Sequence, residues 1–491
     1  MRSSFAIQQA PALRFLTDDQ IREIHQAGLE VLESIGVEVL HEEALALLKG
    51  AGALIEGTRV RIPAGLVKKA MATVPSRIVL AHRNGRRSLF LEGHKSYYGT
   101  GSCCPYTIDP FTLERRMSTK TDVGNMAKLC DYLPNYDFVM SMGLVQDKYP
   151  EIGYIHEFDA MARNTTKSII VSAQDGQNVR DIVEMASAIM GGYNELRKKM
   201  LLAVYTETTS PLRQAEDALD KTLACAELWI PVIHTVGQLS GATAPATLAG
   251  TLVQADAELM SALVIHQLKQ PGAPFFYGGT ITTIDMRTMA HLYGNPEFHI
   301  LSAALTEMGN YFGMPVFSTG GCSDAKSFDA QSAAEGGYSL LLESLAGGNL
   351  IHDIGYVDSG MTSSLSQIMF ANEMIGIAKH VVKGINYSEE HLALDAIGRV
   401  GPGGHFLADD HTSRHFKNEY WFPSLMERRS YTQWAEAGKV TMEEKVNKEV
   451  QRVITEHNAE ALPQETVKVL DGLIARFASE AEARAKARKT R

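Results

Sequence analysis

The sequence contains few cysteines, and they follow no regular spacing. Among its five cysteines there is no Cys-x-x-Cys pair, and His-Glu-x-x-His is also absent, so no established zinc pattern occurs. An odd number of irregular thiols excludes a disulfide framework and fits reduced thiols. We therefore expect no resident metal. Cys103, Cys104 and Cys322 follow predicted strands, so a metal site among them remains the alternative to incidental buried thiols.

Long apolar runs and excess positive charge are also missing. No uncharged apolar run is long enough to span a membrane, and the N-terminal segment lacks the apolar core of a signal peptide. Lys and Arg number 47 against 57 Asp and Glu, a net charge of -10. Nucleic acids and anionic membranes select basic patches. The sequence thus predicts a cytoplasmic protein whose partner is a small molecule or another protein.

Nucleotide-binding loops are absent, and short apolar runs take their place. No Gly-x-Gly-x-x-Gly follows the first predicted strand and no Gly-Lys-Ser/Thr loop occurs, so neither a Rossmann nor a P-loop interpretation is supported. Eight apolar runs end in glycine or polar residues, as strands with functional groups at their ends do. The predicted strands are 97–101, 136–143, 168–173, 201–207, 231–237, 274–279, 314–321 and 349–355.

Segments with helical spacing separate these strands. They are 121–133, 151–163, 179–199, 212–228, 246–268, 296–312 and 330–345, with 364–382 after the last strand. Eight alternating strands and helices predict an α/β fold of the closed (β/α)8 TIM-barrel type, whose usual core of about 250 residues fits this span. An open doubly wound sheet is the alternative.

The barrel is expected to occupy residues 96–384, between two appendages. Residues 1–95 predict an α+β cap: a capping box at Thr17 to Gln20 begins a helix through Val37, a helix covers 41–49, and a β-like pair lies around Val60 and at 78–82. Residues 385–491 predict a mainly helical extension, with a second capping box at 441–444 and a frayed helix at 480–491.

The loops after the carboxyl ends of barrel strands form the active site in this fold. Here they are rich in amides, hydroxyls and aromatic rings but poor in cations. Only Arg287 and Lys326 come near, so a strongly anionic substrate would be poorly neutralised. A quaternary ammonium group has no hydrogen to donate and is held by ring faces, at about 0.5–2 kcal/mol per ring. The candidates for such a cage are Tyr97, Tyr205, Phe276, Tyr277 and Tyr356, about half of which we expect to be packing residues.

Two further features could contribute to a site. His352 and Asp353 are neighbours on a predicted strand, where side chains alternate, so at most one of them should face the barrel interior. His352 is then either a ligand contact or a satisfied interior histidine. Gly403 and Gly404 lie in a glycine-rich turn whose free amides form an anion-binding nest or, alternatively, an ordinary loop.

Several uncommon motifs resemble the trimethylamine methyltransferase family over roughly residues 15–440. They include Tyr98-Gly-Thr-Gly101, Gly241-Ala-Thr-Ala-Pro245, Asp285-Met-Arg287, Ser359-Gly-Met361, and Gly401-Pro-Gly-Gly404 with Glu419-Tyr-Trp-Phe-Pro423. That family has a (β/α)8 barrel. Its best-known members demethylate trimethylamine with a pyrrolysine and pass the methyl group to the cobalt of a separate corrinoid protein. This chain has no pyrrolysine, so it resembles the non-pyrrolysine branch, whose members act on quaternary amines such as glycine betaine, proline betaine or carnitine.

The resemblance implies methyl transfer from a quaternary amine, glycine betaine first, to Co(I) of a partner corrinoid protein, giving dimethylglycine. Displacement from a quaternary ammonium releases a neutral tertiary amine, so no proton donor or Lewis acid is required. The enzyme itself then binds no cofactor, and no catalytic side chain is certain. The aromatic candidates would form the cage, His352, Gly403 and Gly404 would bind the carboxylate, and Gln174 and Glu207 would orient the donor.

Two alternatives stay open. A barrel enzyme could use another donor, such as another betaine, a tertiary methylamine or a methylated thiol. The second alternative is a non-catalytic betaine-binding protein. It would bind betaine without turning it over, and its N-terminal or C-terminal cap would close the barrel mouth. The number of subunits, homo-oligomers included, is not determined by the sequence.

Overall fold

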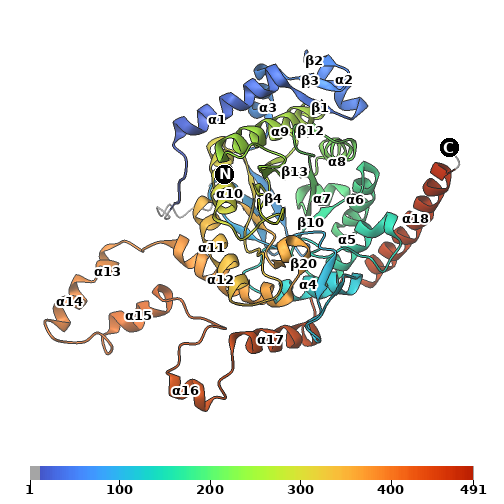
Figure 1. Cartoon of the computed structure of the whole chain (residues 1–491). Coiled ribbons are helices and arrows are strands. Elements are labelled where there is room, and N and C mark those ends of the chain that lie inside the picture. Colours follow the sequence, from blue (N-terminus) through green and yellow to red (C-terminus); the bar gives the residue numbers. More distant parts are fainter. Residues whose placement is uncertain (1–11, 490–491) are drawn as a thin grey trace.

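Eight parallel strands form a ring at the centre of the protein (Figure 1). The computed structural model describes residues 12–489. Around the ring the order is β6-β18-β17-β15-β13-β11-β10-β9. The two ends of this order are joined by a parallel bridge between Gly99 and Phe138 and by a 2.7 Å hydrogen bond from Asp137 N to Tyr98 O. The ring is therefore a barrel, as predicted, and the open-sheet alternative is wrong.

Each barrel strand lies inside one of the eight predicted segments. The strands are shorter than the predicted segments. In the tilted, closely packed ring, each strand is followed by a loop soon after it leaves the core. The strands are β6 (Tyr97–Tyr98), β9 (Phe138–Val139), β10 (Ser168–Ser172), β11 (Leu202–Glu207), β13 (Val232–Thr235), β15 (Phe275–Gly278), β17 (Val316–Thr319) and β18 (Leu350–His352).

The outer helices also follow the prediction, with two differences. The predicted helix 179–199 is two helices, because Gly191 and Gly192 adopt φ of 86° and 124°, which ends the first one. The predicted helix 212–228 starts late, because β12 (Arg213–Gln214) pairs with the N-terminal sheet instead. The helices are α4 (Lys120–Tyr132), α5 (Gly153–Asn164), α6 (Gly176–Met190), α7 (Tyr193–Lys198), α8 (Glu216–Glu227), α9 (Leu248–Lys269), α10 (Pro296–Tyr311), α11 (Ala330–Ala346) and α12 (Leu365–Lys383).

Helix α9 is mostly apolar because the barrel and the N-terminal cap cover it on both faces. It packs on β13 and β15 of the barrel and carries the N-terminal cap on its outer face. Within residues 12–489 it is the one helix long and apolar enough to cross a membrane, and 72% of its apolar window is buried inside the protein. The protein core therefore accounts for this composition.

The N-terminal cap begins at the predicted capping box, where Thr17 and Gln20 bond each other's backbone. The first helix ends at Glu30, and a π-helical turn (Val31–Ile35) leads to Gly36 at φ 81°. Both predicted β-like segments are strands, but they do not pair with each other, because β3 pairs with β1 and β2 and Ile78–Ala81 pairs with Ser88–Leu91. The cap elements are α1 (Asp18–Glu30), β1 (Val37–Val39), α2 (Glu42–Gly50), β2 (Leu54–Glu56), β3 (Arg59–Arg61) and α3 (Ala64–Thr73).

A β-hairpin covers the amino ends of the barrel strands. It consists of β4 (Ile78–Ala81) and β5 (Ser88–Leu91), which pair with each other. Ala81 N bonds Met200 O just before β11, and Arg83 N bonds Thr166 O just before β10. This end of the barrel is therefore covered, and the opposite end is the one available for function.

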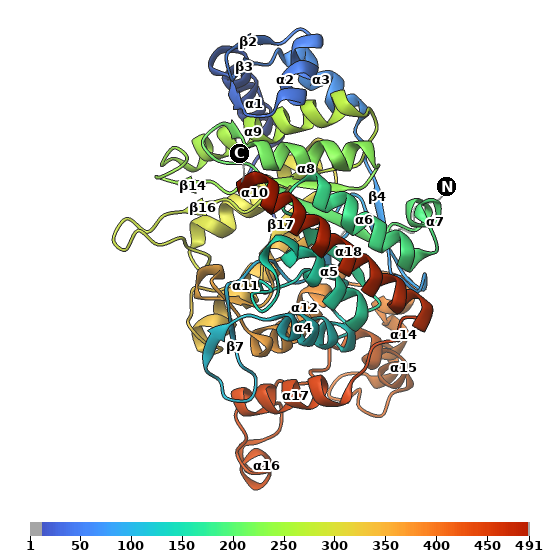
Figure 2. The same cartoon turned by 90° about the vertical axis from the view of Figure 1, so that its right-hand side faces the viewer.

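The C-terminal extension consists of an arm and two helices that return to the barrel (Figures 1 and 2). The arm contains α13 (Glu389–Leu392), α14 (Leu394–Val400), α15 (Asp410–Glu419) and α16 (Tyr431–Glu436) and projects away from the barrel. Helix α17 (Met442–Glu456) starts from the predicted capping box at Thr441 and packs on α4 and α12. Helix α18 (Gln464–Lys489) crosses α5 and α6. Most of these contacts are with outer helices, but Gln451 of α17 also donates a 2.8 Å hydrogen bond to Pro110 O and α18 contacts the turn Pro150–Ile152. The extension therefore flanks the barrel and reaches loops beside it.

Candidate functional site

The carboxyl ends of the strands and the loops that follow them form the mouth of the barrel. Two small sheets border it: β7 (Tyr106–Ile108), β8 (Arg115–Met117), β19 (Tyr356–Val357) and β20 (Thr362–Ser363) form one, and β14 (Leu239–Ser240) with β16 (Thr282–Thr283) the other. Figure 2 shows β14, β16 and β7 on one side of the molecule, and Gln451 of α17 donates a 2.8 Å hydrogen bond to Pro110 O in the loop between β7 and β8. The functional side chains at the mouth come from several different strands, as is usual for this fold.

Tyr205 and Glu207 lie two residues apart on β11 and therefore point to the same side of the strand. The Tyr205 hydroxyl donates a 2.9 Å hydrogen bond to Glu207 Oε2. A Cβ at Gly237, on the neighbouring strand's loop, would lie 1.9 Å from Glu207 Oε1. The missing side chain at Gly237 thus gives the carboxylate its room.

Glu207 is deeply placed and yet solvent-accessible. Burial among protein atoms raises its pKa, and the nearby Asp353 carboxyl raises it further. Its side chain is nevertheless exposed and Tyr205 is half-buried. Glu207 lies within the ring of strands and still has accessible surface. There must therefore be open space next to its carboxylate, at the centre of the mouth.

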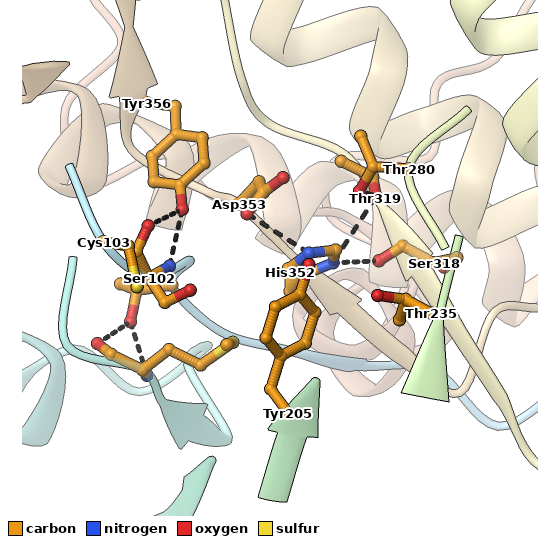
Figure 3. A network of polar contacts seen from close by, with 12 residues as sticks. Ser102, Cys103, Tyr205, Thr235, Thr280, Ser318, Thr319, His352, Asp353 and Tyr356 are labelled. Carbon is orange, nitrogen blue, oxygen red and sulfur yellow. Dashed lines mark hydrogen bonds and ion pairs between the residues drawn. The ribbon is translucent and has the colours of Figure 1, made fainter. Parts of the chain in front are cut away.

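His352 and Asp353 both point into the site, contrary to the expectation that at most one would (Figure 3). Strand β18 ends at His352, and Asp353 adopts φ 67°, so strand alternation no longer applies. His352 Nε2 lies 3.2 Å from Asp353 Oδ1. Both residues are almost fully buried, at 2% and 3% exposure.

The His352 ring carries no positive charge near neutral pH. Its Nδ1 lies 2.8 Å from the carbonyl oxygen of Ser318 and so must donate to it, which leaves Nε2 as an acceptor facing Asp353. Burial lowers the pKa of His352 to about 3 and raises the pKa of Asp353 to about 7. The contact is thus between a neutral imidazole and a carboxyl that titrates near neutrality. A neutral ring cannot supply the counter-charge for a substrate carboxylate.

Three tyrosine rings lie near these acids, and a deeper phenylalanine packs behind them. Phe317 on β17 lies 3.9 Å from the His352 ring and 5.9 Å from Tyr205, measured between centroids. Tyr293 lies 6.2 Å from Tyr356, and its hydroxyl is 3.4 Å from Asp353 Oδ2. Their elements are far apart in the sequence and meet only in the folded barrel. Tyr205 and Tyr356 were predicted for such a cage, whereas Phe317 and Tyr293 were not.

Tyr356 is held in place by the loop after β6. Its hydroxyl accepts a 2.5 Å hydrogen bond from Ser102 N and donates to Ser102 O. A Cβ at Gly101 would lie 2.4 Å from the Tyr356 hydroxyl and 2.3 Å from Asp353 Oδ1. Gly101, part of the Tyr98-Gly-Thr-Gly101 motif, therefore makes room for both side chains.

Hydroxyls and a thiol line the remaining parts of the cluster (Figure 3). Thr280 and Thr319 lie 2.9 Å apart, oxygen to oxygen. Cys103 Sγ lies 3.6 Å from Ser172 Oγ, and burial raises the pKa of this thiol to about 11. Cys103 is therefore a protonated, uncharged group at neutral pH. Cys104 and Cys322 are fully buried free thiols.

Three of the predicted cage residues do not lie at the mouth of the barrel: two are placed elsewhere, and one lies deeper in the barrel interior. The Tyr97 hydroxyl accepts a 3.1 Å hydrogen bond from Phe90 N in the hairpin, at the covered end of the barrel. Tyr277 points outward, where its hydroxyl donates to Asp256 Oδ1 of α9 at 3.0 Å. Phe276 alternates with Tyr277 and so faces the interior, where it is 1% exposed. The structure does not bring Tyr97 or Tyr277 to the mouth.

Three predicted polar groups also lie away from the cluster. Gln174 is exposed and lines a groove of about 200 Å³ beside Arg484 of α18. Gly403 and Gly404 are exposed in the arm, between α14 and α15. Figure 1 shows this arm outside the barrel, so the glycine amides do not face the mouth.

A metal centre is not evident at the mouth. Across residues 12–489, no group of three or more His, Cys, Asp or Glu side chains gathers in a way that could hold a metal ion. What the cluster presents is carboxyl groups, ring faces and hydroxyls, a set of groups suited to an organic cation.

Comparison with known proteins agrees with this arrangement. The family described as trimethylamine methyltransferase (MTTB) matches residues 2–482. A trimethylamine methyltransferase MttB of Desulfitobacterium hafniense (strain DSM 10664 / DCB-2) is 32% identical over 93% of this chain and 92% of its own length. A glycine betaine methyltransferase of Desulfitobacterium hafniense (strain Y51) is 30% identical over 96% of this chain and 99% of its own.

The fold also occurs in a solved structure. The monomethylamine methyltransferase MtmB of Methanosarcina barkeri covers 90% of this chain and 87% of its own, with a TM-score of 0.53 at 12% identity. At that identity the likeness concerns the fold alone. The family match along nearly the whole chain and relatives of matching length lead to one conclusion: the protein is a methyltransferase that belongs to the trimethylamine methyltransferase family.

Proposed function

We propose that this enzyme moves a methyl group from a quaternary ammonium compound to the Co(I) centre of a corrinoid carried by a separate protein. The carbon–nitrogen bond breaks with its electron pair going to nitrogen, and the cobalt supplies the pair that forms the new bond to carbon. The amine leaves neutral, so no proton has to be supplied. The corrinoid is the methyl acceptor and thus a substrate, and we place the reaction in the cytoplasm.

The observation that carries this proposal is the pairing of ring faces with acids at an accessible mouth. Tyr205 contacts Glu207, and Tyr293 and Tyr356 lie beside Asp353, while Phe317 packs deeper against Tyr205 and His352 at 1% exposure. Ring faces attract an alkylammonium group by cation–π interaction, and a nearby carboxyl adds attraction. The chain has no pyrrolysine to activate a less reactive donor. These groups can bind and orient the cation, which is what a direct displacement requires.

The open mouth supports an enzyme over a non-catalytic binding protein. The binding-protein alternative expects a terminal cap over the mouth. Instead the N-terminal cap packs on α9, α17 packs on α4 and α12, and α18 packs on α5 and α6. These two C-terminal helices reach the rim where Gln451 bonds Pro110 O and where α18 contacts the turn Pro150–Ile152. The half-buried Tyr205 and the exposed Glu207 remain accessible from outside. A corrinoid held by another protein needs such access to the donor, so these residues fit the acceptor that the family implies.

Glycine betaine is the first donor to test, because a relative of full matching length bears that name. The purified enzyme is incubated with betaine, reduced corrinoid and its carrier protein, and dimethylglycine is followed by NMR. Formation of dimethylglycine, or of the corresponding tertiary amine from another quaternary donor, is expected. Absence of demethylated product across glycine betaine, proline betaine, carnitine and tetramethylammonium would refute the proposed reaction.

A further inference from the structure

Most basic side chains near the mouth pair with other acids or are exposed, and Arg484 of α18 lines the groove beside Gln174. Arg115 lies 3.3 Å and Lys326 2.8 Å from the Asp358 carboxylate at the rim. Lys221, which lowers the pKa of Glu207 from a distance, is in α8 and lies 3.5 Å from Asp217. Arg287 is exposed on the loop that follows β16. In the described part of the chain, the side-chain hydrogen bonds and ion pairs that the structure shows for Glu207, His352 and Asp353 go to Tyr205, Tyr293, Thr319, the Ser318 carbonyl and each other, and not to a lysine or arginine.

The uncharged groups do not replace a cation. The His352 ring donates through Nδ1 to Ser318 O and faces the Asp353 carboxyl with Nε2. The Tyr356 hydroxyl is used by Ser102, and the Tyr205 hydroxyl by Glu207. The glycine amides of the Gly401-Pro-Gly-Gly404 turn lie in the arm. A substrate carboxylate in this cluster would therefore face the Glu207 carboxylate, which accepts a hydrogen bond from Tyr205, and would find no lysine or arginine bonded there, which is unfavourable.

We infer that the donor is a cation with a neutral remaining substituent, rather than a betaine whose carboxylate lies next to the ammonium group. This inference rests on the proposed function and narrows its substrate class. It also names Glu207 as the residue that discriminates, because Glu207 Oε2 is held by Tyr205 while Oε1 lies against Gly237 at the accessible centre of the mouth. Rejection of the zwitterion would then come from like-charge repulsion.

A matched pair of ligands tests the charge of the donor. Glycine betaine and its carboxamide have the same trimethylammonium group and nearly the same size, but only the betaine has a carboxylate. Binding of each to the full-length enzyme is measured by calorimetry without corrinoid. We expect the carboxamide to bind at least about tenfold more tightly, a difference of about 1.4 kcal/mol. Equal binding, tighter binding of betaine, or no binding of either at millimolar concentration would overturn the inference.

Variants test the assignment to Glu207. In Glu207→Gln the carboxylate that repels the zwitterion is gone, so the carboxamide-to-betaine affinity ratio should fall several-fold. Glu151→Gln removes one exposed acid of the short helix before α5 and serves as the matched control, with an unchanged ratio. An unchanged ratio in Glu207→Gln would overturn the role of this residue. Circular dichroism shows whether each variant is folded.

Transfer assays separate the two possible failures. If the carboxamide binds selectively but no demethylated amine forms with the reduced corrinoid protein, the proposed reaction fails and the charge preference stands. If betaine is demethylated with the higher kcat/KM, the proposed reaction stands and the charge preference fails.

Discussion

Glu157 of α5 should make the stability of this protein depend on pH in a predictable direction. Its side chain is 1% exposed, and its Oε2 has no hydrogen-bond partner among the described residues. It lies near Cys103, whose pKa it raises. Burial raises the pKa of Glu157 to about 8, although Ser141 and the Val145 amide partly oppose this. A carboxyl in the unfolded chain titrates near its ordinary value of about 4.3.

The sign follows from proton binding. Between about pH 4 and pH 8 the folded protein keeps the Glu157 proton, whereas the unfolded chain loses it. Folding therefore becomes less favourable as the pH rises through this window, by about 1.4 kcal/mol per pH unit. The raised pKa corresponds to about 5 kcal/mol above pH 8, as an order of magnitude.

The change to test is Glu157→Gln, which keeps the shape and removes the titration. Guanidinium unfolding of the wild type and the variant is measured at several values between pH 5 and pH 9. The free energy of unfolding of the variant minus that of the wild type should increase steadily with pH, because all other titrating groups cancel. Glu151→Gln, an exposed acid nearby, should give a flat difference. A flat difference for Glu157→Gln as well would refute the raised pKa.

Other substitutions examine the site itself. Tyr356→Ala should raise the KM for the donor several-fold, and an unchanged KM would remove this ring from the cage. Tyr277→Phe should leave that KM unchanged while lowering the free energy of unfolding by about 1–3 kcal/mol, since buried Asp256 loses the hydroxyl bond at 3.0 Å; a raised KM would contradict its outward orientation. Gly237→Ala should lower kcat/KM about tenfold or more, because the new Cβ displaces Glu207; unchanged kinetics in a folded variant would contradict the placement of this carboxylate.

The barrel strands could be predicted because they are buried on both faces. Such strands read as short, continuous apolar runs, and glycines mark their ends. Because both faces of these strands are buried and apolar, the sequence does not show which side chains point into the barrel. Phe-Phe-Tyr at 275–277 is apolar throughout, so the sequence does not show that Tyr277 faces α9 while Phe276 faces the interior. Tyr97 begins its strand and so lies near the covered end.

A site residue could be predicted from the sequence only where its position on a regular strand determines where its side chain lies. Tyr205, Glu207 and His352 lie at the carboxyl ends of regular strands and are found at the mouth. Asp353 depends on a positive φ, which removes the alternation that the prediction assumed. Tyr293 belongs to the long connection between β15 and α10, and its contact with Tyr356 joins positions 63 residues apart along the chain. No local pattern encodes such a pairing.

The charges of the cluster also bear on rate under the proposed function. Methyl transfer turns the cationic donor into a neutral amine, so any carboxylate that holds the cation loses its partner as the reaction proceeds. Strong ion pairing would stabilise the bound donor more than the transition state and would slow the transfer.

Here the pKa of Asp353 is raised to about 7 and that of Glu207 is also raised. Near neutral pH the Asp353 carboxyl therefore holds less negative charge than an ordinary carboxylate would. The rings of Tyr205, Phe317, Tyr293 and Tyr356 then supply a larger share of the attraction, at about 0.5–2 kcal/mol each. Because that attraction is weaker per contact than a buried ion pair, less of it has to be given up when the positive charge disappears.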